Sequence, residues 1–363
     1  MKVLILSCST GGGHNSCARY VLNELEKNNI EAVFSDFYDI VNTGMKEMSS
    51  KVYLSMLGGN GGVFKNVYKL GELYSKTKIK SPVYLVNKFH KKALYNYIIS
   101  NKIDLVIATH LFPSLTLTAI NKDKRHKKIN FITIATDYEP CPFLEECKPN
   151  YFIMQKGLED KFIKKGISSD VLFNSGIPVS SCFVYGAKNI RDELKIKNEK
   201  VILIMLGSMG FGKINKIIDD ILRFDNVKVL VVCGNNKRLY DNLNQINNSK
   251  LKVFGFVNNI NDLIYSSDIV LSKPGGLSST EITSIRKPLL HIFPIPGIET
   301  YNTDFFESHG MSIKCESEND IVTNLKKLLN DYKLQDSMIK NQEKYINKNS
   351  CKDLVDLIKN DFN

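Results

Sequence analysis

Tryptophan, arginine and long apolar runs are the main absences in this sequence. It contains no tryptophan, and 43 lysines against six arginines make up its 49 basic residues. Proteins that read nucleic-acid sequence depend on arginine for paired hydrogen bonds to bases, and no such module is visible, so nucleic acid is not an expected partner. No apolar run approaches the roughly 20 residues that cross a bilayer, so we expect no membrane-spanning helix.

The cysteines follow no pairing pattern. All eight are scattered and no two form a C-x-x-C pair, so neither a zinc site nor a disulfide framework is expected. The N-terminal MKVLILSCST has too short an apolar part for a signal peptide and leads directly into a glycine loop, which predicts a first strand instead. With no export signal, we expect reduced thiols and a cytoplasmic protein.

Length and composition predict an ordinary globular protein with two domains. The chain has 363 residues, of which 43% are apolar and 24% are charged, and this length is natural for two domains. The net charge of +11 leaves two interpretations open. It reflects either a general lysine and asparagine bias or attraction to an anionic membrane surface.

Residues 268–302 carry the strongest local pattern. They contain, in order, an apolar strand, a glycine turn, an amphipathic helix, a second strand and a second turn: 269–271, 273–276, a helix from about 277, 289–293 and 294–297. Gly275 and Gly276 have no Cβ, so the backbone can approach a ligand closely. The helix N-terminus then favours a diphosphate, with Lys273 as a counter-charge. Glu281, one turn into the helix, could accept hydrogen bonds from ribose hydroxyls.

A second glycine turn lies near the N-terminus. A continuously apolar strand at 2–9 leads into Gly11-Gly12-Gly13-His14, and a helix follows to about residue 28. Because this is not the G-x-G-x-x-G pattern, a nicotinamide cofactor is not indicated. His14 lies where the strand gives way to the helix, at the edge where open α/β sheets usually carry their sites.

The βα alternation continues along most of the chain. Further apolar strands are expected at 31–37, 103–109, 129–136, 151–154, 171–173, 201–206, 227–233 and 252–256. Two of these strands end in polar tips, Thr109-His110 and Thr136-Asp137-Tyr138. Both tips fall at the carboxyl edge of a parallel sheet, where binding sites gather.

Residues 45–100 mix lysine with aromatic side chains. Glu72 is the only acid between positions 50 and 100, and Phe64, Lys65, Tyr68 and Lys69 illustrate the mixture. This composition predicts an amphipathic segment in contact with a membrane interface. A helical excursion that packs on the first domain and merely solvates its lysines is the alternative.

The motifs taken together resemble a known family. KPGGLSSTE, PIPG-x-E-x-x-N, the GGGH loop, T-H-x-F-P and the later T-D are similar to segments of the diacylglycerol glycosyltransferases. These are the monogalactosyl- and processive glucosyl-diacylglycerol synthases, distant relatives of the N-acetylglucosaminyltransferase that completes lipid II. The resemblance covers nearly the whole chain and implies the α/β fold class GT-B, with two Rossmann-like parallel-sheet domains facing a central cleft.

The resemblance also implies which domain binds which substrate. It assigns residues 1–178 to the acceptor and membrane side and 179–345 to the nucleotide sugar, with 346–363 as a helix that crosses back to the first domain. The implied reaction is inverting transfer of a hexose from a UDP-sugar to diacylglycerol or a glycosyl-diacylglycerol, at the inner face of the cell membrane. No D-x-D-like carboxylate pair follows a donor strand, so no cofactor and no obligatory metal are expected.

The family's functional positions transfer to residues of this chain. His14 is the candidate catalytic base, and Asp137 is either an alternative base or the residue that orients it. The implied donor-binding residues are Gly207, Ser208, Gly210, Phe256, Val257, Lys273, Pro274, Gly275, Gly276, Leu277, Ser278, Glu281, Glu299 and Asn302. The implied acceptor-side residues are Gly12, Gly13, His110, Pro113 and Tyr138, and the membrane contact is expected at Phe64, Lys65, Tyr68 and Lys69.

Two departures from the family limit what it implies. Many relatives carry a histidine and a tryptophan shortly after the T-D, where this chain has Glu139-Pro140-Cys141-Pro142. The family commonly has glutamine at the position of Ile298, and isoleucine cannot hydrogen-bond sugar hydroxyls. Glucose, galactose and N-acetylglucosamine therefore all stay open as the donor sugar. Another acceptor, such as a polyprenyl-linked or small-molecule hydroxyl, and a non-catalytic UDP-sugar sensor are the alternative functions.

Overall fold

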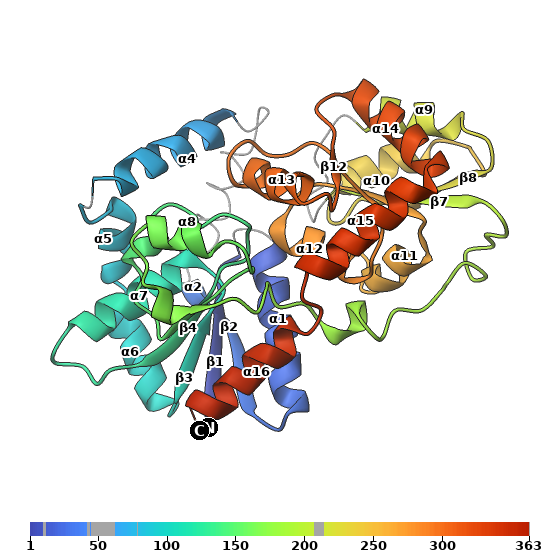
Figure 1. Ribbon diagram of the computed structural model, residues 1–363. Helices are drawn as coiled ribbons and strands as arrows, with labels where there is room; N and C mark the ends of the chain where they lie inside the picture. Colours follow the sequence, from blue (N-terminus) through green and yellow to red (C-terminus); the bar gives the residue numbers. More distant parts are fainter. Residues whose placement is uncertain (10–11, 42–43, 45–61, 78, 207–213, 363) are drawn as a thin grey trace. The chain divides into compact units, whose positions relative to one another are not determined.

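The chain divides into two compact units (Figure 1). The computed structural model describes residues 1–362 except 10–11, 42–43, 45–61, 78 and 207–213, and it describes no side chain at 62–64. Unit 1 contains Met1–Ser180, Ile295–Ile298 and Asn349–Asn363, and unit 2 contains Ser181–Pro294 and Glu299–Lys348.

Unit 1 is built on a parallel sheet with the strand order β2-β1-β3-β4-β5-β6. Its strands are β1 (Lys2–Ser7), β2 (Glu31–Asp36), β3 (Leu105–Ala108), β4 (Asn130–Ile134), β5 (Tyr151–Ile153) and β6 (Leu172–Phe173). Strand β1 is apolar from Val3 to Leu6 because it lies inside the sheet and is covered on both faces.

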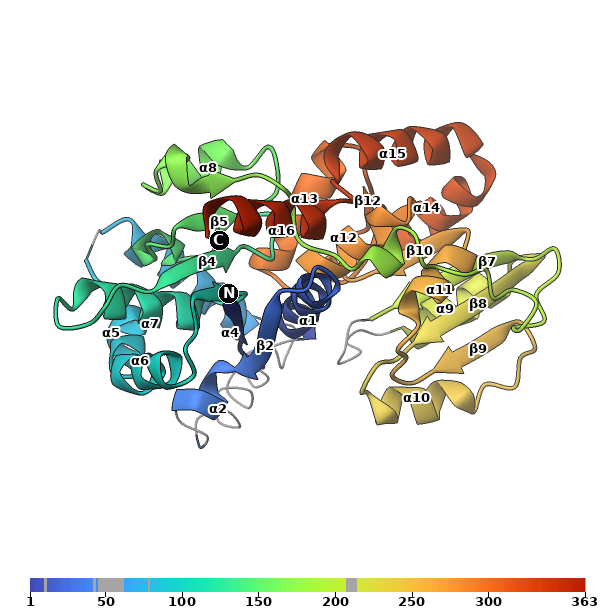
Figure 2. The same ribbon diagram turned by 90° about the horizontal axis from the view of Figure 1, so that it is seen from below.

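Helices cover both faces of this sheet. The unit contains α1 (Gly12–Lys27), α2 (Phe37–Val41), α4 (Gly62–Ser75), α5 (Pro82–Lys88), α6 (Lys91–Ser100), α7 (Leu111–Lys122), α8 (Glu159–Lys164), the short turns η1 (Leu144–Glu146) and η2 (Ser169–Val171), and α16 (Ser350–Asp361). The C-terminal α16 packs beside α1 (Figures 1 and 2), and α5 and α6 pack against α7.

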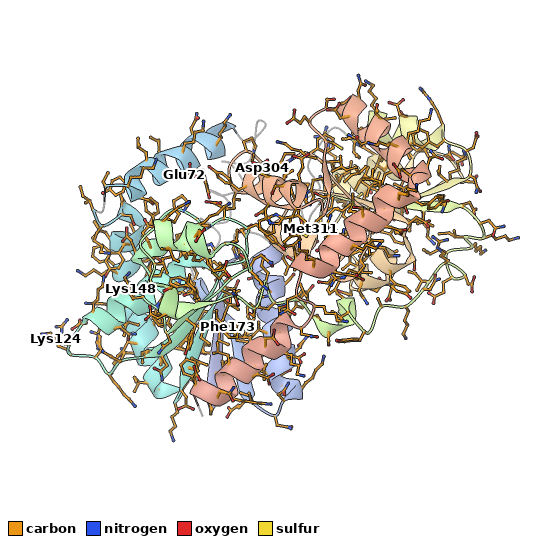
Figure 3. All side chains as sticks on the ribbon, in the orientation of Figure 1. Glu72, Lys124, Lys148, Phe173, Asp304 and Met311 are labelled. Atoms are coloured by element: carbon orange, nitrogen blue, oxygen red, sulfur yellow. The ribbon has the colours of Figure 1, made fainter. Side chains whose placement is uncertain are left out.

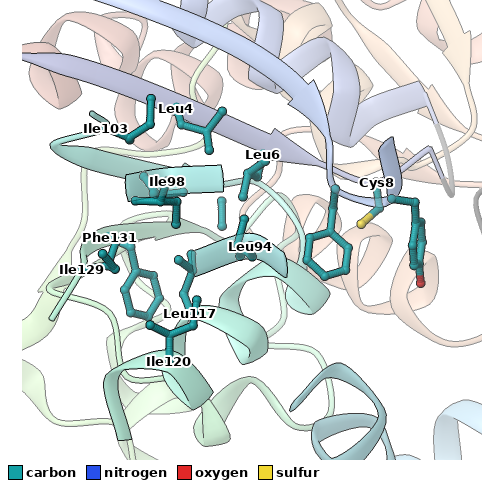
Figure 4. Close-up of a cluster of buried hydrophobic side chains, with 14 residues drawn as sticks. Leu4, Leu6, Cys8, Leu94, Ile98, Ile103, Leu117, Ile120, Ile129 and Phe131 are labelled. Carbon is teal, nitrogen blue, oxygen red and sulfur yellow. The ribbon is translucent and has the colours of Figure 1, made fainter. Parts of the chain in front are cut away.

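Alternate side chains of β1 supply the two faces of the sheet. Leu4 and Leu6 lie in a buried cluster with Leu94, Leu117 and Phe131, which come from α6, α7 and β4 (Figure 4). Val3 and Ile5 are equally buried and, by the two-residue period of a strand, point to the opposite face. The core therefore runs through the sheet and fixes the position of the loop that follows β1.

Unit 2 repeats the architecture with the strand order β12-β11-β10-β7-β8-β9, again all parallel. Its strands are β7 (Lys200–Met205), β8 (Val227–Val232), β9 (Leu251–Phe254), β10 (Ile269–Ser272), β11 (Leu289–His291) and β12 (Ile313–Lys314). Its helices are η3 (Ser181–Phe183), α9 (Asn215–Leu222), α10 (Lys237–Asn244), α11 (Ile260–Ser266), α12 (Gly276–Ser284), α13 (Ile298–Ser308), α14 (Glu318–Asn330) and α15 (Tyr332–Tyr345).

The predicted strands all form, and their ends differ by a few residues. The strand expected at 129–136 stops at Ile134, and the one expected at 289–293 stops at His291. Pro294 and Phe293, which has φ of 50°, follow the shortened β11, and proline cannot donate to a sheet. No helix within the described part of the chain is long and apolar enough to cross a membrane.

Candidate functional site

The topology of unit 1 brings three polar strand ends together. Strands β1, β3 and β4 are neighbours in the sheet and run parallel. Their carboxyl ends therefore meet at one edge. His14 follows β1, Thr109 and His110 follow β3, and Thr136 and Asp137 follow β4. The structure thus places the two predicted catalytic residues on the same edge of the same sheet.

Thr109 holds His14 at two points. The Nδ1 atom of His14 lies 2.8 Å from the carbonyl oxygen of Thr109, and the Thr109 hydroxyl donates to the His14 carbonyl at 3.1 Å. A carbonyl oxygen can only accept, so Nδ1 must carry the imidazole proton. The Thr136 hydroxyl lies 3.0 Å from the same nitrogen. The lone pair of the neutral ring is therefore on Nε2, where a base needs it.

The surroundings of His14 favour the neutral ring. Burial lowers the pKa of His14, while the carboxylate of Asp137 and the Thr109 carbonyl act in the opposite direction. The net pKa lies below the ordinary value of 6.5, and the positive end of a helix dipole also disfavours the charged imidazolium. Asp137 is close enough to influence that pKa and is itself half-buried.

His110 has a different role from His14. It is the N-cap of α7, and its Nδ1 accepts a hydrogen bond from the Phe112 N–H at 3.2 Å. Burial and the nearby His14 lower the pKa of His110 well below its ordinary value, so the cap is neutral. The two imidazole rings meet edge to face at 4.8 Å. His110 therefore caps α7 and packs its ring against His14.

The other acceptor-side residues differ in their accessibility. Gly12 and Gly13 form the exposed first turn of α1. Pro113 is buried in the first turn of α7, and Tyr138 is fully buried. Only the two glycines present an open surface, so Pro113 and Tyr138 contribute by packing.

A carboxylate that the sequence did not single out for this role braces the loop before α1. Asp36, at the end of β2, accepts hydrogen bonds from the Ser9 N–H at 2.9 Å and the Ser9 hydroxyl at 2.6 Å. The Asn15 side chain then donates to the Ser9 hydroxyl at 3.1 Å. The sequence feature that could have identified this role is an acid at the carboxyl end of the strand next to β1.

In unit 2 the glycine turn after β10 forms as predicted. Gly275 is the N-cap of α12, and no side chain caps the helix. A Cβ added to Gly275 would meet nothing within 4 Å, so the space over this residue is open. At the turn and the start of α12, Gly275 and Ser278 are half-exposed. Pro274, Gly276 and Leu277 are buried. A ligand can therefore reach the helix N-terminus at these two positions.

The charged and amide side chains near the turn already have partners. Lys273 is only 6% exposed and pairs with Glu299 at 3.6 Å. Burial lowers the pKa of Lys273, and Glu299 acts against that effect. Asn302 is fully buried, and its side-chain N–H₂ donates to the Pro274 carbonyl at 3.0 Å. In this structure Glu299 and Asn302 hold the turn in place, and Glu281 is buried on α12.

His291 is a feature of this site that the sequence reasoning missed. Its ring is fully buried, with Nε2 lying 2.9 Å from the Ser279 hydroxyl and Nδ1 lying 3.1 Å from the Ser312 hydroxyl. Burial lowers its pKa to about 3, so the ring is neutral. It ties α12 to β11 and to the start of β12. The sequence feature that could have identified His291 is a polar residue inside an otherwise apolar parallel strand.

The remaining donor residues lie in loops at the strand ends. Phe256 follows β9 with 65% of its surface exposed, and Val257 is half-buried beside it. Gly207, Ser208 and Gly210 lie outside the described residues. An exposed aromatic ring at the carboxyl end of a strand is consistent with a contact to a nucleotide base.

Helix α4 separates two kinds of side chain. Lys65, Lys69 and the large apolar residues Leu70 and Leu73 are exposed, and the two leucines are 65% and 64% accessible. Tyr68 lies on the other face, where burial raises its pKa and the neighbouring Cys141 and Asp137 raise it further. The sequence predicted Tyr68 as a membrane contact, and in the structure it is half-buried on the inward side of the helix. The side chain of Phe64 lies outside what the structure describes.

Glu72, labelled in Figure 3, is the only acid in the sequence of α4. Its charge opposes those of Lys65, Lys69 and the exposed Lys76 that follows the helix. The outward face of α4 is therefore basic and apolar at the same time. Among the residues that the structure describes, no three His, Cys, Asp or Glu side chains gather to hold a metal ion.

Two family models match successive parts of the chain. Residues 14–179 match the model described as monogalactosyldiacylglycerol (MGDG) synthase. Residues 201–358 match the glycosyltransferase family 28 C-terminal domain. The first match begins at His14 and the second contains the complete glycine turn after β10.

Characterised relatives align over almost the full length. The processive diacylglycerol beta-glucosyltransferase of Bacillus pumilus is 29% identical, with 98% of this chain and 94% of that protein aligned. The enzyme of the same name from Bacillus subtilis is 28% identical over 94% of this chain and 90% of its own length.

Solved structures share the fold at low identity. MurG of Acinetobacter baumannii superposes with a TM-score of 0.65 at 15% identity, covering 99% of both chains. The spinosyn rhamnosyltransferase SpnG superposes with a TM-score of 0.68 at 10% identity, covering 99% of this chain and all of its own. Both likenesses support the predicted GT-B fold class, which the two parallel-sheet units confirm. The chain is a family 28 glycosyltransferase and belongs to the diacylglycerol glycosyltransferases.

Proposed function

We propose that this protein transfers glucose from UDP-glucose to the free hydroxyl of diacylglycerol, or of a glucosyl-diacylglycerol, at the inner face of the cell membrane. The observation that carries the proposal is the fixed tautomer of His14, within a chain of this family. Thr109 holds the proton on Nδ1, so Nε2 can take the proton of an attacking hydroxyl.

The reaction is a single displacement. Nε2 of His14 accepts the hydroxyl proton while the acceptor oxygen bonds to the anomeric carbon. The bond from that carbon to the diphosphate breaks, UDP leaves with the electron pair, and the configuration inverts. The lowered pKa of His14 keeps it neutral and ready to accept a proton near pH 7.

Unit 2 supplies the donor side of this proposal. The uncapped N-terminus of α12, with open space over Gly275, suits the diphosphate of the donor. The helix dipole stabilises the negative charge that develops on the leaving UDP. Lys273 directly precedes the turn and forms an ion pair with Glu299 in this structure.

The choice of glucose comes from the relatives. The aligned Bacillus proteins are named as beta-glucosyltransferases, whereas the family model of the first unit is named for monogalactosyl transfer. Since Ile298 cannot hydrogen-bond a sugar hydroxyl, the discrimination would fall to other donor-side residues. The test is calorimetric binding of UDP, UDP-glucose, UDP-galactose and UDP-N-acetylglucosamine, where preference for another sugar would contradict this part.

The membrane part of the proposal rests on the outward face of α4. Leu70 and Leu73 would enter the interface between head groups and acyl chains, with Lys65 and Lys69 against anionic lipid. The acceptor is a lipid and the exposed apolar face is on the acceptor-side unit. A peripheral attachment of this kind brings the enzyme to its substrate.

Transfer of radiolabelled sugar to diacylglycerol in anionic vesicles tests the whole function. We expect a labelled product that extracts into organic solvent and whose mass shows one or more hexoses on diacylglycerol. Label on a polyprenyl-linked or water-soluble acceptor would favour a different acceptor. Binding of UDP-sugars without any product would favour a sensor.

A further inference from the structure

Helix α4 is anchored on the segment that directly follows Asp137. Gly71 of α4 lies so close to this segment that an added Cβ would be 3.1 Å from Pro142 Cβ and 3.6 Å from the Phe143 ring. Contacts this short leave little room for a side chain. The helix and the segment can approach each other because residue 71 is glycine.

Two further contacts fix how the helix sits on Phe143. The Phe143 N–H donates to the Ser75 hydroxyl at 3.1 Å, and the Phe143 ring meets the Tyr74 ring edge to face at 6.1 Å. Phe143 has φ of 71° and ψ of 1°, a left-handed conformation that aromatic residues rarely adopt. Such a conformation persists where neighbours hold it, and it is typical of functional sites.

The connection from Phe143 back to Asp137 is short and stiff. Pro140 and Pro142 have fixed φ angles, and the residue before each proline is restricted to extended conformations. Tyr138 is completely buried and cannot shift freely. A displacement at Phe143 is therefore passed along the chain to Asp137 instead of being absorbed between them.

The start of α5 contacts the same segment at its other end, through a hydrogen bond and an ion pair to Glu146. The Ser81 N–H donates to Glu146 Oε1 at 2.8 Å, and Lys80 Nζ lies 3.5 Å from Glu146 Oε2. Glu146 is buried, which strengthens both its hydrogen bond to Ser81 and its ion pair with Lys80. The segment 139–146 is thus attached to α4 at Phe143 and to α5 at Glu146.

We propose that α4 couples contact with the lipid surface to the position of Asp137, with Gly71 and Ser75 as positioning residues. The inference rests on the proposed function. The outward face of α4 carries the exposed Leu70 and Leu73, and its inward face contacts the segment that follows Asp137. Lipid bound to one face steadies the helix, and the helix steadies the carboxylate beside the base.

A pair of isosteric substitutions tests this coupling. Ser75→Val removes the hydroxyl that accepts from Phe143, while Ser75→Thr has the same shape and keeps it. We expect Ser75→Val to lower kcat for transfer to vesicle-borne diacylglycerol about tenfold, the value of one partly buried hydrogen bond. The KM for the UDP-sugar, calorimetric UDP binding and vesicle co-sedimentation should stay unchanged. Ser75→Thr should behave as the wild type does.

Gly71→Val gives an independent perturbation of the same contact. Its side chain forces the helix away from Pro142, so we expect a larger loss of kcat than for Ser75→Val. Asn66→Val places the same side chain on the exposed face of the same helix, and as the matched control it should keep a normal kcat at saturating vesicle concentration. Circular dichroism confirms that each variant is folded.

The pH profile distinguishes positioning from general damage. His14 faces Asp137 and His110, together with the uncharged Thr109 and Thr136 groups, and Asp137 raises the pKa of His14. Moving Asp137 away lowers that pKa, so the acid limb of kcat/KM should shift to lower pH in Ser75→Val and Gly71→Val. Unchanged kcat and an unchanged acid limb in both folded variants would overturn the proposal.

Titration of His14 by NMR gives the same answer without turnover. If the wild type transfers no sugar, the proposed function fails, but the pKa of His14 still reports the position of Asp137. A lower pKa in Ser75→Val and a wild-type pKa in Ser75→Thr support the coupling. Equal pKa values in all three proteins contradict it, whatever the reaction is.

Discussion

At the scale of single residues, the proposed activity depends on His14 as the base. Its Nδ1–H is held by the Thr109 carbonyl, so a replacement that lacks the imidazole removes the base without disturbing the donor unit. We predict that His14→Ala lowers kcat by about 10²–10⁴, the usual contribution of general base catalysis. Calorimetry should show normal UDP binding. Unchanged turnover would remove His14 as the base.

The pH dependence separates His14 from Asp137. Burial lowers the pKa of His14 and Asp137 partly restores it. The base acts in its neutral form, so activity rises with pH through this pKa, and the acid limb should lie below pH 6.5, the ordinary histidine value. Asp137→Asn removes the restoring charge, and we expect the limb to move to lower pH in profiles of kcat/KM. Complete loss of activity at every pH would instead make Asp137 the base.

His291 makes a prediction about stability. Its pKa is about 3 in the folded protein against an ordinary 6.5, so between these values the unfolded chain binds the extra proton. Stability is therefore complete above pH 6.5 and is lost as the pH falls. From pH 7.5 to 5 this residue should cost about 2 kcal/mol.

Urea unfolding of His291→Gln at the two pH values measures that cost. The variant should lack this part of the pH dependence, because glutamine does not titrate. His309→Gln, a partly exposed histidine in the same unit, is the control. Equal pH dependence in the wild type and His291→Gln would contradict the assignment.

At the scale of elements, helix α13 holds the glycine turn through Glu299, which pairs with Lys273, and through the amide of Asn302. Asn302 donates to the Pro274 carbonyl from a fully buried position. Asn302→Leu leaves that carbonyl without its partner, at a cost of about 1–3 kcal/mol. We expect the turn to loosen and the Kd for UDP, measured by calorimetry, to rise about tenfold or more. Thr303→Val, the next buried position on the same helix, should bind UDP normally.

The same elements show what the sequence could predict. Apolar runs, glycine turns and polar strand ends were enough to locate β1, β10 and the convergence of His14 with Asp137, because buried parallel strands leave a strong local signal. The partner of Lys273 could not be read from the sequence, since Glu299 is brought to it by tertiary packing. The half-burial of Tyr68, which was expected at the membrane contact, could not be read from the sequence because composition does not fix the rotation of a helix.

At the scale of the whole molecule, the net charge of +11 matters for membrane binding only if it is localised. Lys65, Lys69 and Lys76 are exposed on or next to α4, beside Leu70. Each lysine close to an anionic surface contributes about 1 kcal/mol. Changing the three lysines to glutamine should weaken binding to anionic vesicles by about 3 kcal/mol, or about 100-fold.

A charge-matched variant makes this prediction specific to α4. Lys326, Lys327 and Lys333 are equally exposed but belong to unit 2, so changing them to glutamine alters the net charge by the same amount. We expect this control to bind vesicles almost as the wild type does, since these lysines are not part of the proposed lipid contact on α4. Equal weakening of both variants in co-sedimentation would show that overall charge drives binding and that α4 has no special part. Binding that persists in the α4 variant and is insensitive to salt would assign the contact to Leu70 and Leu73 alone.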